Sequence, residues 1–204
     1  MIDNFEEEDM FTDFDVPTRK MLTGNLLMIL CCVFYLAWWL LAFKPTAPVK
    51  GMKSGWLLIP ALLLGVAAVW QIGSGSGAVE NQMKLLSGTS VLIGGVVAYI
   101  ILLAGTSVLL KRQVTTELFL IVGWAVLMFL ELNALHGMGP FTKIMTVLLL
   151  AEIIIAAIVS LICYLLYYNL DRLKGYVDGM IPLLLIMAMM AVVTIRVIVS
   201  GGKI

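Results

Sequence analysis

The chain has 204 residues, of which 62% are hydrophobic and 13% are charged, and its formal net charge is zero. Soluble globular domains contain about 45–50% apolar and about 25% charged residues, so this surplus of apolar residues excludes an ordinary water-soluble domain. The lack of net positive charge and of a basic, aromatic-rich segment argues against binding to nucleic acid.

The amino-terminal segment is strongly acidic. Residues 1–16, MIDNFEEEDMFTDFDV, contain seven acidic residues and no basic residue. We expect residues 1–20 to form a solvated, disordered tail, because so charged a segment cannot bury a core. The alternative is a short amphipathic docking peptide for a basic partner, since large apolar residues such as Phe5 and Phe11 alternate with the acids.

Six apolar segments follow, each long enough to cross about 30 Å of hydrocarbon as a helix. Clusters of Gly, Pro and charged residues separate them. One cluster, GSGSG at 73–77, lacks the preceding strand that a nucleotide-binding loop requires, so we interpret it as a flexible turn. Residues 21–204 are therefore predicted to form an all-α integral membrane protein, a bundle of six transmembrane helices with short loops. The predicted spans are 22–43, 55–73, 86–110, 117–136, 141–168 and 181–200.

An even number of spans places both termini on one side of the membrane. The positive-inside rule compares the basic residues at or beyond the span ends on the two sides. The terminal side carries five: Arg19, Lys20, Lys84, Lys143 and Lys203. The other side carries seven: Lys44, Lys50, Lys53, Lys111, Arg112, Arg172 and Lys174. This difference predicts that both termini lie outside. We expect a multi-pass protein of a bacterial-type plasma membrane.

A carboxyl group, Glu152, interrupts the apolar run LLLAEIIIAAIV at 148–159. It lies about 11 residues into its span, which at 1.5 Å per residue is about 16 Å and near the bilayer midplane. Ala156, Ser160, Cys163 and Tyr167 follow at helical spacing, which predicts that Glu152 belongs to a small, polar face directed inward. An intramembrane acid is expected to be a proton or cation site, and the structural alternative is a neutral acid that hydrogen-bonds between helices.

Other polar residues concentrate in the terminal-side half of the predicted spans. Glu131 and Arg196 share one depth, so we expect them to form an ion pair, of a kind more often structural than functional. Together with Glu152 they predict a polar, water-filled vestibule that opens on the terminal side and ends at Glu152. The other residues of this half are Asn25, Asn133, His136 and Thr146.

The sequence carries no catalytic or metal-binding signature. The HExxH, GxSxG and P-loop patterns are absent, and a single histidine, His136, cannot hold zinc or haem through histidines. Cys31, Cys32 and Cys163 fall inside apolar runs, where we expect small core residues and no disulfide framework. We therefore expect no catalytic residue, metal or cofactor.

The leading interpretation is a transporter or binding subunit for a small solute, ion or proton, acting without covalent chemistry. Glu152 would be its titrating group, and the pathway would be lined by Asn25, Glu131, Thr146, Ser160 and Arg196. The alternative is a non-transporting accessory or assembly subunit of a larger membrane complex. That protein would bind its partner through the acidic tail or through small-residue helix faces, such as the stripe formed by Ser90, Gly94, Ala98 and Gly105.

Overall fold

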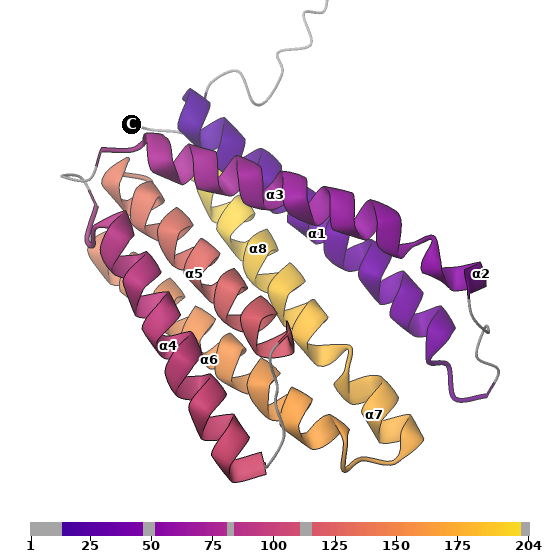
Figure 1. Cartoon of the computed structure of the whole chain (residues 1–204). Helices are drawn as coiled ribbons and strands as arrows, with labels where there is room; N and C mark the ends of the chain where they lie inside the picture. Colours follow the sequence, from indigo (N-terminus) through magenta and orange to yellow (C-terminus); the bar gives the residue numbers. More distant parts are fainter. Residues whose placement is uncertain (1–13, 47–51, 81–83, 111–115, 201–204) are drawn as a thin grey trace, which may run out of the picture.

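The computed structural model describes residues 14–46, 52–80, 84–110 and 116–200, and the regular structure within these ranges is entirely helical (Figure 1). Within these ranges six helices are long and apolar enough to cross a membrane, which confirms the predicted number of membrane-length helices. They are α1 (Val16–Ala42), α3 (Leu58–Ala78), α4 (Gly88–Leu110), α5 (Thr116–Gly137), α6 (Lys143–Tyr167) and α8 (Ile181–Val199). Two shorter helices, α2 (Met52–Gly55) and α7 (Arg172–Asp178), precede α3 and α8.

Helix α1 begins earlier than the apolar pattern predicts. The Asp15 side chain caps it by accepting a hydrogen bond from the Thr18 backbone N–H at 3.2 Å, and Pro17 occupies the first turn. An acid at the N-cap and a proline in the first turn both favour helix initiation. Residues 16–20 of the predicted tail are therefore helical, whereas the prediction for residues 1–13 lies outside the described residues.

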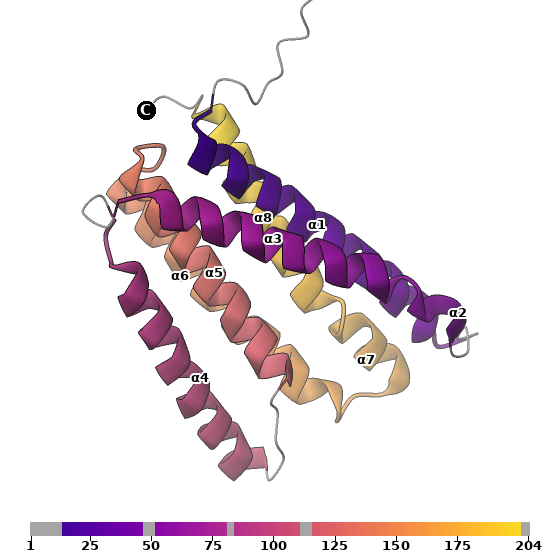
Figure 2. The ribbon, with the colours of Figure 1, turned by 45° about the horizontal axis from the view of Figure 1, so that its top comes forward.

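The prediction of a flexible turn at GSGSG is wrong, because residues 73–77 lie inside α3. Helices α1 and α3 lie side by side and antiparallel (Figures 1 and 2), and glycines mark their closest approach. A Cβ atom at Gly75 would lie 2.8 Å from the Pro17 carbonyl oxygen, and one at Gly24 would lie 3.0 Å from the Ile72 backbone nitrogen. The glycines remove the side chains that would keep the two backbones apart.

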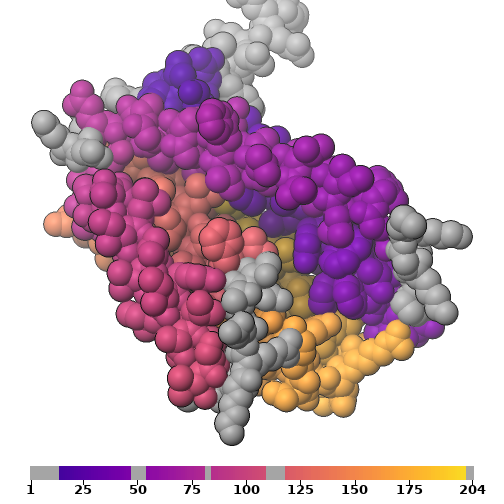
Figure 3. Space-filling view, viewed as in Figure 1, coloured from indigo at the N-terminus to yellow at the C-terminus, as the bar shows by residue number. Residues whose placement is uncertain are grey.

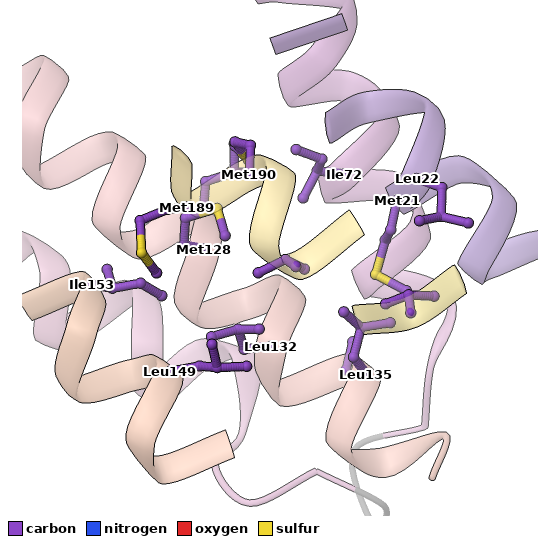
Figure 4. Packing of buried hydrophobic residues seen from close by; sticks show 14 of the residues in the cluster. Met21, Leu22, Ile72, Met128, Leu132, Leu135, Leu149, Ile153, Met189 and Met190 are labelled. Carbon is purple, nitrogen blue, oxygen red and sulfur yellow. The ribbon is translucent and has the colours of Figure 1, made fainter. Parts of the chain in front are cut away.

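The start of α1 and the end of α8 lie at one end of the bundle, which we call the terminal end (Figures 1 and 2). Helix α5 contacts α3, α4 and α6, and α8 contacts both α1 and α6. Helix α4 packs on α5 at the edge of the bundle. The core lies where α1, α3, α5, α6 and α8 converge (Figure 4). It includes Met21, Leu22, Ile72, Met128, Leu132, Leu135, Leu149, Ile153, Met189 and Met190.

The opposite end of the molecule is rich in aromatic side chains. The Trp39 indole N–H donates to the Tyr176 carbonyl oxygen at 3.0 Å, and the Trp39 ring stacks on Phe43 with 4.3 Å between centroids. A cavity of about 480 Å³ opens there between the ends of α1 and α6 and helix α7. Figure 3 also shows the molecule hollowed below α3, with α1 and α8 visible deeper between α5 and α7.

Candidate functional site

The structure brings together two of the predicted pathway residues, Asn25 of α1 and Glu131 of α5. Both side chains have 0% of their surface exposed. The Asn25 Nδ2 donates to Glu131 Oε1 at 2.6 Å, although 106 positions separate the two residues in sequence. Neighbouring positions on the same helices, such as Leu22, Met128 and Leu132, belong to the apolar core. The amide and the carboxyl group are therefore held in an apolar environment.

This pair leaves hydrogen-bonding capacity unused. Asn25 Oδ1 and Glu131 Oε2 are buried without a hydrogen-bond partner in the described part of the chain, and so is Thr194 Oγ1 of α8. A buried polar atom without a partner costs about 1–3 kcal/mol, so native proteins contain few of them. Two such atoms on one hydrogen-bonded pair indicate a place where a further polar group, water or ion could bind.

The geometry of the pair suits a carboxyl group that gains and loses a proton. Turning the Asn25 amide by 180° would place its oxygen where a protonated Glu131 can donate to it. An ionised Glu131 instead accepts from the Asn25 N–H. One amide can therefore satisfy Glu131 in both forms, and the neutral form avoids the cost of an unpaired buried charge.

The predicted ion pair between Glu131 and Arg196 is wrong for the arrangement described. Glu131 has Asn25 as its hydrogen-bond partner, whereas Arg196 is exposed on α8. Among the described residues, an ion pair forms only between Lys174 and Asp171, with 3.3 Å between the charged atoms. Glu131 and Arg196 do lie in the same half of their helices, but a shared depth does not determine which way two side chains point.

The predicted inward orientation of Glu152 is also wrong, because its side chain is exposed on the outside of α6. Three other members of the predicted face, Ala156, Ser160 and Cys163, are buried as expected. The buried line continues through Ile153 and Leu149. Since successive residues differ by about 100° around a helix, Glu152 lies beside this buried line and does not belong to it. The exposed position of Glu152 therefore does not support the predicted vestibule that ends at this residue.

Three further polar residues of the terminal-side half bind the ends of helices together. Asn133 accepts from the Leu86 backbone N–H at 3.1 Å and donates to the Leu86 carbonyl oxygen. His136 Nδ1 lies 3.1 Å from the Phe141 carbonyl oxygen and 3.3 Å from Thr146 Oγ1. These contacts give Asn133, His136 and Thr146 structural roles at the turns between helices.

The small-residue stripe predicted in the third span does not form a helix contact within the described chain. Ser90, Gly94 and Ala98 are exposed, and a Cβ atom at Gly94 or Gly105 would have nothing within 4 Å. The neighbouring glycine, Gly95, is the one that packs, because a Cβ atom there would collide with Val126 of α5.

Among the described residues, no group of three or more His, Cys, Asp or Glu side chains could hold a metal ion. No protein-family model, curated protein or solved structure matches this chain. The evidence for the candidate site is therefore its geometry alone.

The sequence placed Asn25 and Glu131 in the same half of the bundle but did not predict that they form a hydrogen bond. The one sequence signal that could have suggested this pair is the number of residues between each side chain and the terminal end of its helix.

Proposed function

We propose that the chain is a multi-pass membrane protein that binds or conducts a proton, with Glu131 as its titrating group and Asn25 as the partner of that group. The fully buried Asn25–Glu131 hydrogen bond, with one oxygen of each side chain unpartnered in the described chain, carries the proposal. Intramembrane acids that face the interior of a bundle commonly mark ion and proton pathways.

A proton fits this site better than a metal cation does. Sodium and divalent cations require several oxygen ligands, as calcium with its 6–8 ligands illustrates. The pair offers only Asn25 Oδ1 and the Glu131 carboxyl oxygens, with Thr194 Oγ1 as one further buried hydroxyl on α8. A proton needs a single acceptor atom and a partner for the resulting O–H group. The proposed role involves no covalent chemistry.

We also propose a plasma membrane of the bacterial type, with both termini outside. The orientation rests on five basic residues at the terminal side against seven at the other side. Exposed positions at the two ends of the bundle test this orientation. Ser87→Cys should react with a membrane-impermeant maleimide added to intact cells, whereas Asp171→Cys should react only after the cells are permeabilised. The opposite labelling pattern would reverse the orientation.

Proton uptake by liposomes that contain the protein tests the function. A potassium gradient with valinomycin supplies the driving voltage, and an enclosed pH-sensitive dye reports the protons. We expect Glu131→Gln to lower the uptake rate at least tenfold, because Gln keeps the shape and a hydrogen bond but cannot ionise. Glu80→Gln, which removes an exposed carboxyl group at the end of α3, should leave the rate unchanged.

Infrared difference spectra across pH provide a second measurement on the same proteins in lipid. The wild-type protein should show a titrating carboxyl band that disappears in Glu131→Gln and persists in Glu80→Gln. Uptake that equals the rate of protein-free vesicles, or that survives in Glu131→Gln, would refute the proposal. That result would leave the accessory-subunit interpretation as the better one.

A further inference from the structure

We propose that two copies of this chain associate in the membrane through the outer faces of α6 and α8, with Glu152 of each copy paired to Arg196 of the partner subunit. This inference rests on the membrane placement in the proposed function but not on proton binding at Glu131. Within the described part of the chain, both side chains are exposed and neither has a hydrogen-bond or ion-pair partner. The two helices contact one another, so the two opposite charges lie on adjacent elements.

The helical positions place both charges along the outer edge of the contact between α6 and α8. Ile153 of α6 and Met189 of α8 belong to one core cluster and lie together in Figure 4. Arg196 follows Met189 by seven residues, about two turns, so it projects from the same side of α8. On α6, Thr146 marks the side that faces α5 through its contact with His136. Glu152 lies about 120° away from Thr146 around the helix, on the side toward α8.

Glu152 of one copy and Arg196 of the partner subunit would also lean toward one another along the membrane normal, because a two-fold axis along that normal leaves the depth of every residue unchanged. From the level of Ile153 and Met189, a rise of 1.5 Å per residue places Arg196 about 9 Å closer to the terminal end than Glu152. Side chains on a helix tilt toward its N-terminus. Helix α6 starts at the terminal end and α8 ends there, so Glu152 tilts toward that end and Arg196 tilts away from it. The long arginine side chain can cover the remaining separation.

Charge, and not apolar area, indicates that this face binds protein. Apolar side chains such as Ile155 and Val192 are exposed on the same face, but lipid tails solvate them as well as another helix would. An ionisable side chain exposed to hydrocarbon is expensive and normally pairs with an opposite charge. Small exposed residues on the same helices, Ala151 and Ala188, would permit close approach of a second helix.

A second copy of the chain supplies the complement without any further protein. In a two-fold symmetric interface, if residue i contacts residue j of the partner, then residue j contacts residue i of the partner. A face that carries both Glu152 and Arg196 therefore satisfies all four charges with two identical ion pairs. Such a face is self-complementary, which a face with one sign of charge is not.

Charge reversal gives a test that distinguishes pairing between chains from pairing within one chain. Glu152→Arg creates a face with two positive charges, and Arg196→Glu creates a face with two negative charges. Expressed alone, each variant should be monomeric in lipid. Expressed together with different tags, the two should copurify at least tenfold more than either variant does with a differently tagged copy of itself. Only a symmetric interface between chains predicts this exclusive heterodimer, because pairing within one chain cannot be restored by mixing.

Cross-linking of chains that keep both charges covers the case in which the reversed variants fail to fold. In a background with Cys31, Cys32 and Cys163 replaced by Ala, Ile155→Cys in one tagged chain should form a disulfide with Ala188→Cys in the other, because a rise of 1.5 Å per residue places the two positions within about 2 Å of one depth. Leu62→Cys on α3 and Ile101→Cys on α4, which are both more exposed than Ile155, are the control pair and should not react. Adding Glu152→Gln or Arg196→Gln to the reactive pair should lower its yield at least fivefold.

Several results would overturn the inference. One is a monomeric wild-type protein in lipid at low protein density, as expected if Arg196 binds lipid headgroups or another membrane protein covers the face. Another is rescue by the double charge reversal in one chain without rescue by mixing. The proton-uptake assay is independent of these results, so loss of uptake in Glu131→Gln with a monomeric protein would refute the dimer alone. Removal of the chain from membranes by alkaline carbonate would instead refute the membrane placement itself.

Discussion

Asn25 and Glu131 meet inside the apolar core with 2.6 Å between the amide nitrogen and a carboxyl oxygen, and neither side chain reaches the surface. The burial of each side chain therefore depends on the presence of the other. An amide without the carboxyl group would leave more polar atoms unpartnered, and the carboxyl group without the amide would leave both of its oxygens unpartnered. The contact also joins α1 to α5, which are the first and the fourth of the membrane-length helices along the chain.

A double-mutant cycle on this pair should show strong coupling. Asn25→Leu and Glu131→Met each remove one partner, and each should lower the free energy of unfolding by about 1–3 kcal/mol because the other polar group stays buried. The double variant replaces both by apolar groups of similar size and should cost less than the sum by about 1–3 kcal/mol. Denaturation in mixed micelles measures all four proteins. Additivity within about 0.5 kcal/mol would show that the two side chains do not interact.

The two exposed glycines of GSGSG differ from the buried one in what a methyl group would meet. At Gly75 a new Cβ atom would lie 2.8 Å from the Pro17 carbonyl oxygen, which is backbone and cannot move aside freely. Gly75→Ala should therefore separate α1 from α3 and lower stability by about 1–3 kcal/mol.

Gly73→Ala and Gly77→Ala are controls within the same five residues, since nothing in the described part of the chain lies within 4 Å of either added Cβ atom. Each should raise stability by about 0.5–1 kcal/mol, because alanine is the better helix former. Thermal unfolding in detergent compares the three variants. A loss of stability at all three positions would instead mean that this stretch is not helical in the native protein.

The number of membrane-length helices could be predicted from the sequence because the thickness of the bilayer sets the length of an apolar run. The orientation of each helix could not. In a water-soluble protein an exposed position is usually polar, whereas here Leu148 and Ile155 on the outside of α6 are as apolar as Ile153 on the inside. A lone acid such as Glu152 is then consistent with either face, and the spacing of small residues assigned it to the wrong one.

Glycine is similarly ambiguous, since its lack of a side chain suits both a turn and a close helix contact. GSGSG has the composition of a turn, but the backbone of α1 at Pro17 fills the space beside Gly75. The partner of Glu131 was missed for a related reason. Depth along a span limits the candidate partners to one half of the bilayer, and only the three-dimensional arrangement of the helices, which directs Asn25 toward Glu131 and leaves Arg196 exposed, decides between them.

Asn133 should be important for the turn between α3 and α4, because it forms hydrogen bonds with both the N–H and the carbonyl oxygen of Leu86. Asn133→Asp keeps an acceptor but loses the donor, so the Leu86 carbonyl oxygen would face an acid. We expect a loss of about 1–3 kcal/mol and faster hydrogen exchange over residues 84–88. Asn169→Asp, the same change at an exposed position, is the control and should alter neither quantity. Unchanged exchange in Asn133→Asp would rule out this double hydrogen bond as the anchor of the turn.

Helix α4 contacts α5 at the edge of the bundle, so one well-placed side chain should be enough to displace it. Gly95→Leu would collide with Val126 of α5, whereas Gly94→Leu would project into open space. The Tyr99 and Phe119 rings, 6.1 Å apart between centroids, give a readout specific to this contact. Cysteines in their place, one on each helix, should be joined readily by a short bifunctional maleimide in the Gly94→Leu protein and at least fivefold more slowly in the Gly95→Leu protein. Equal rates would mean that α4 approaches α5 through another face, in which case Gly95 would have no role in holding the edge helix to the bundle.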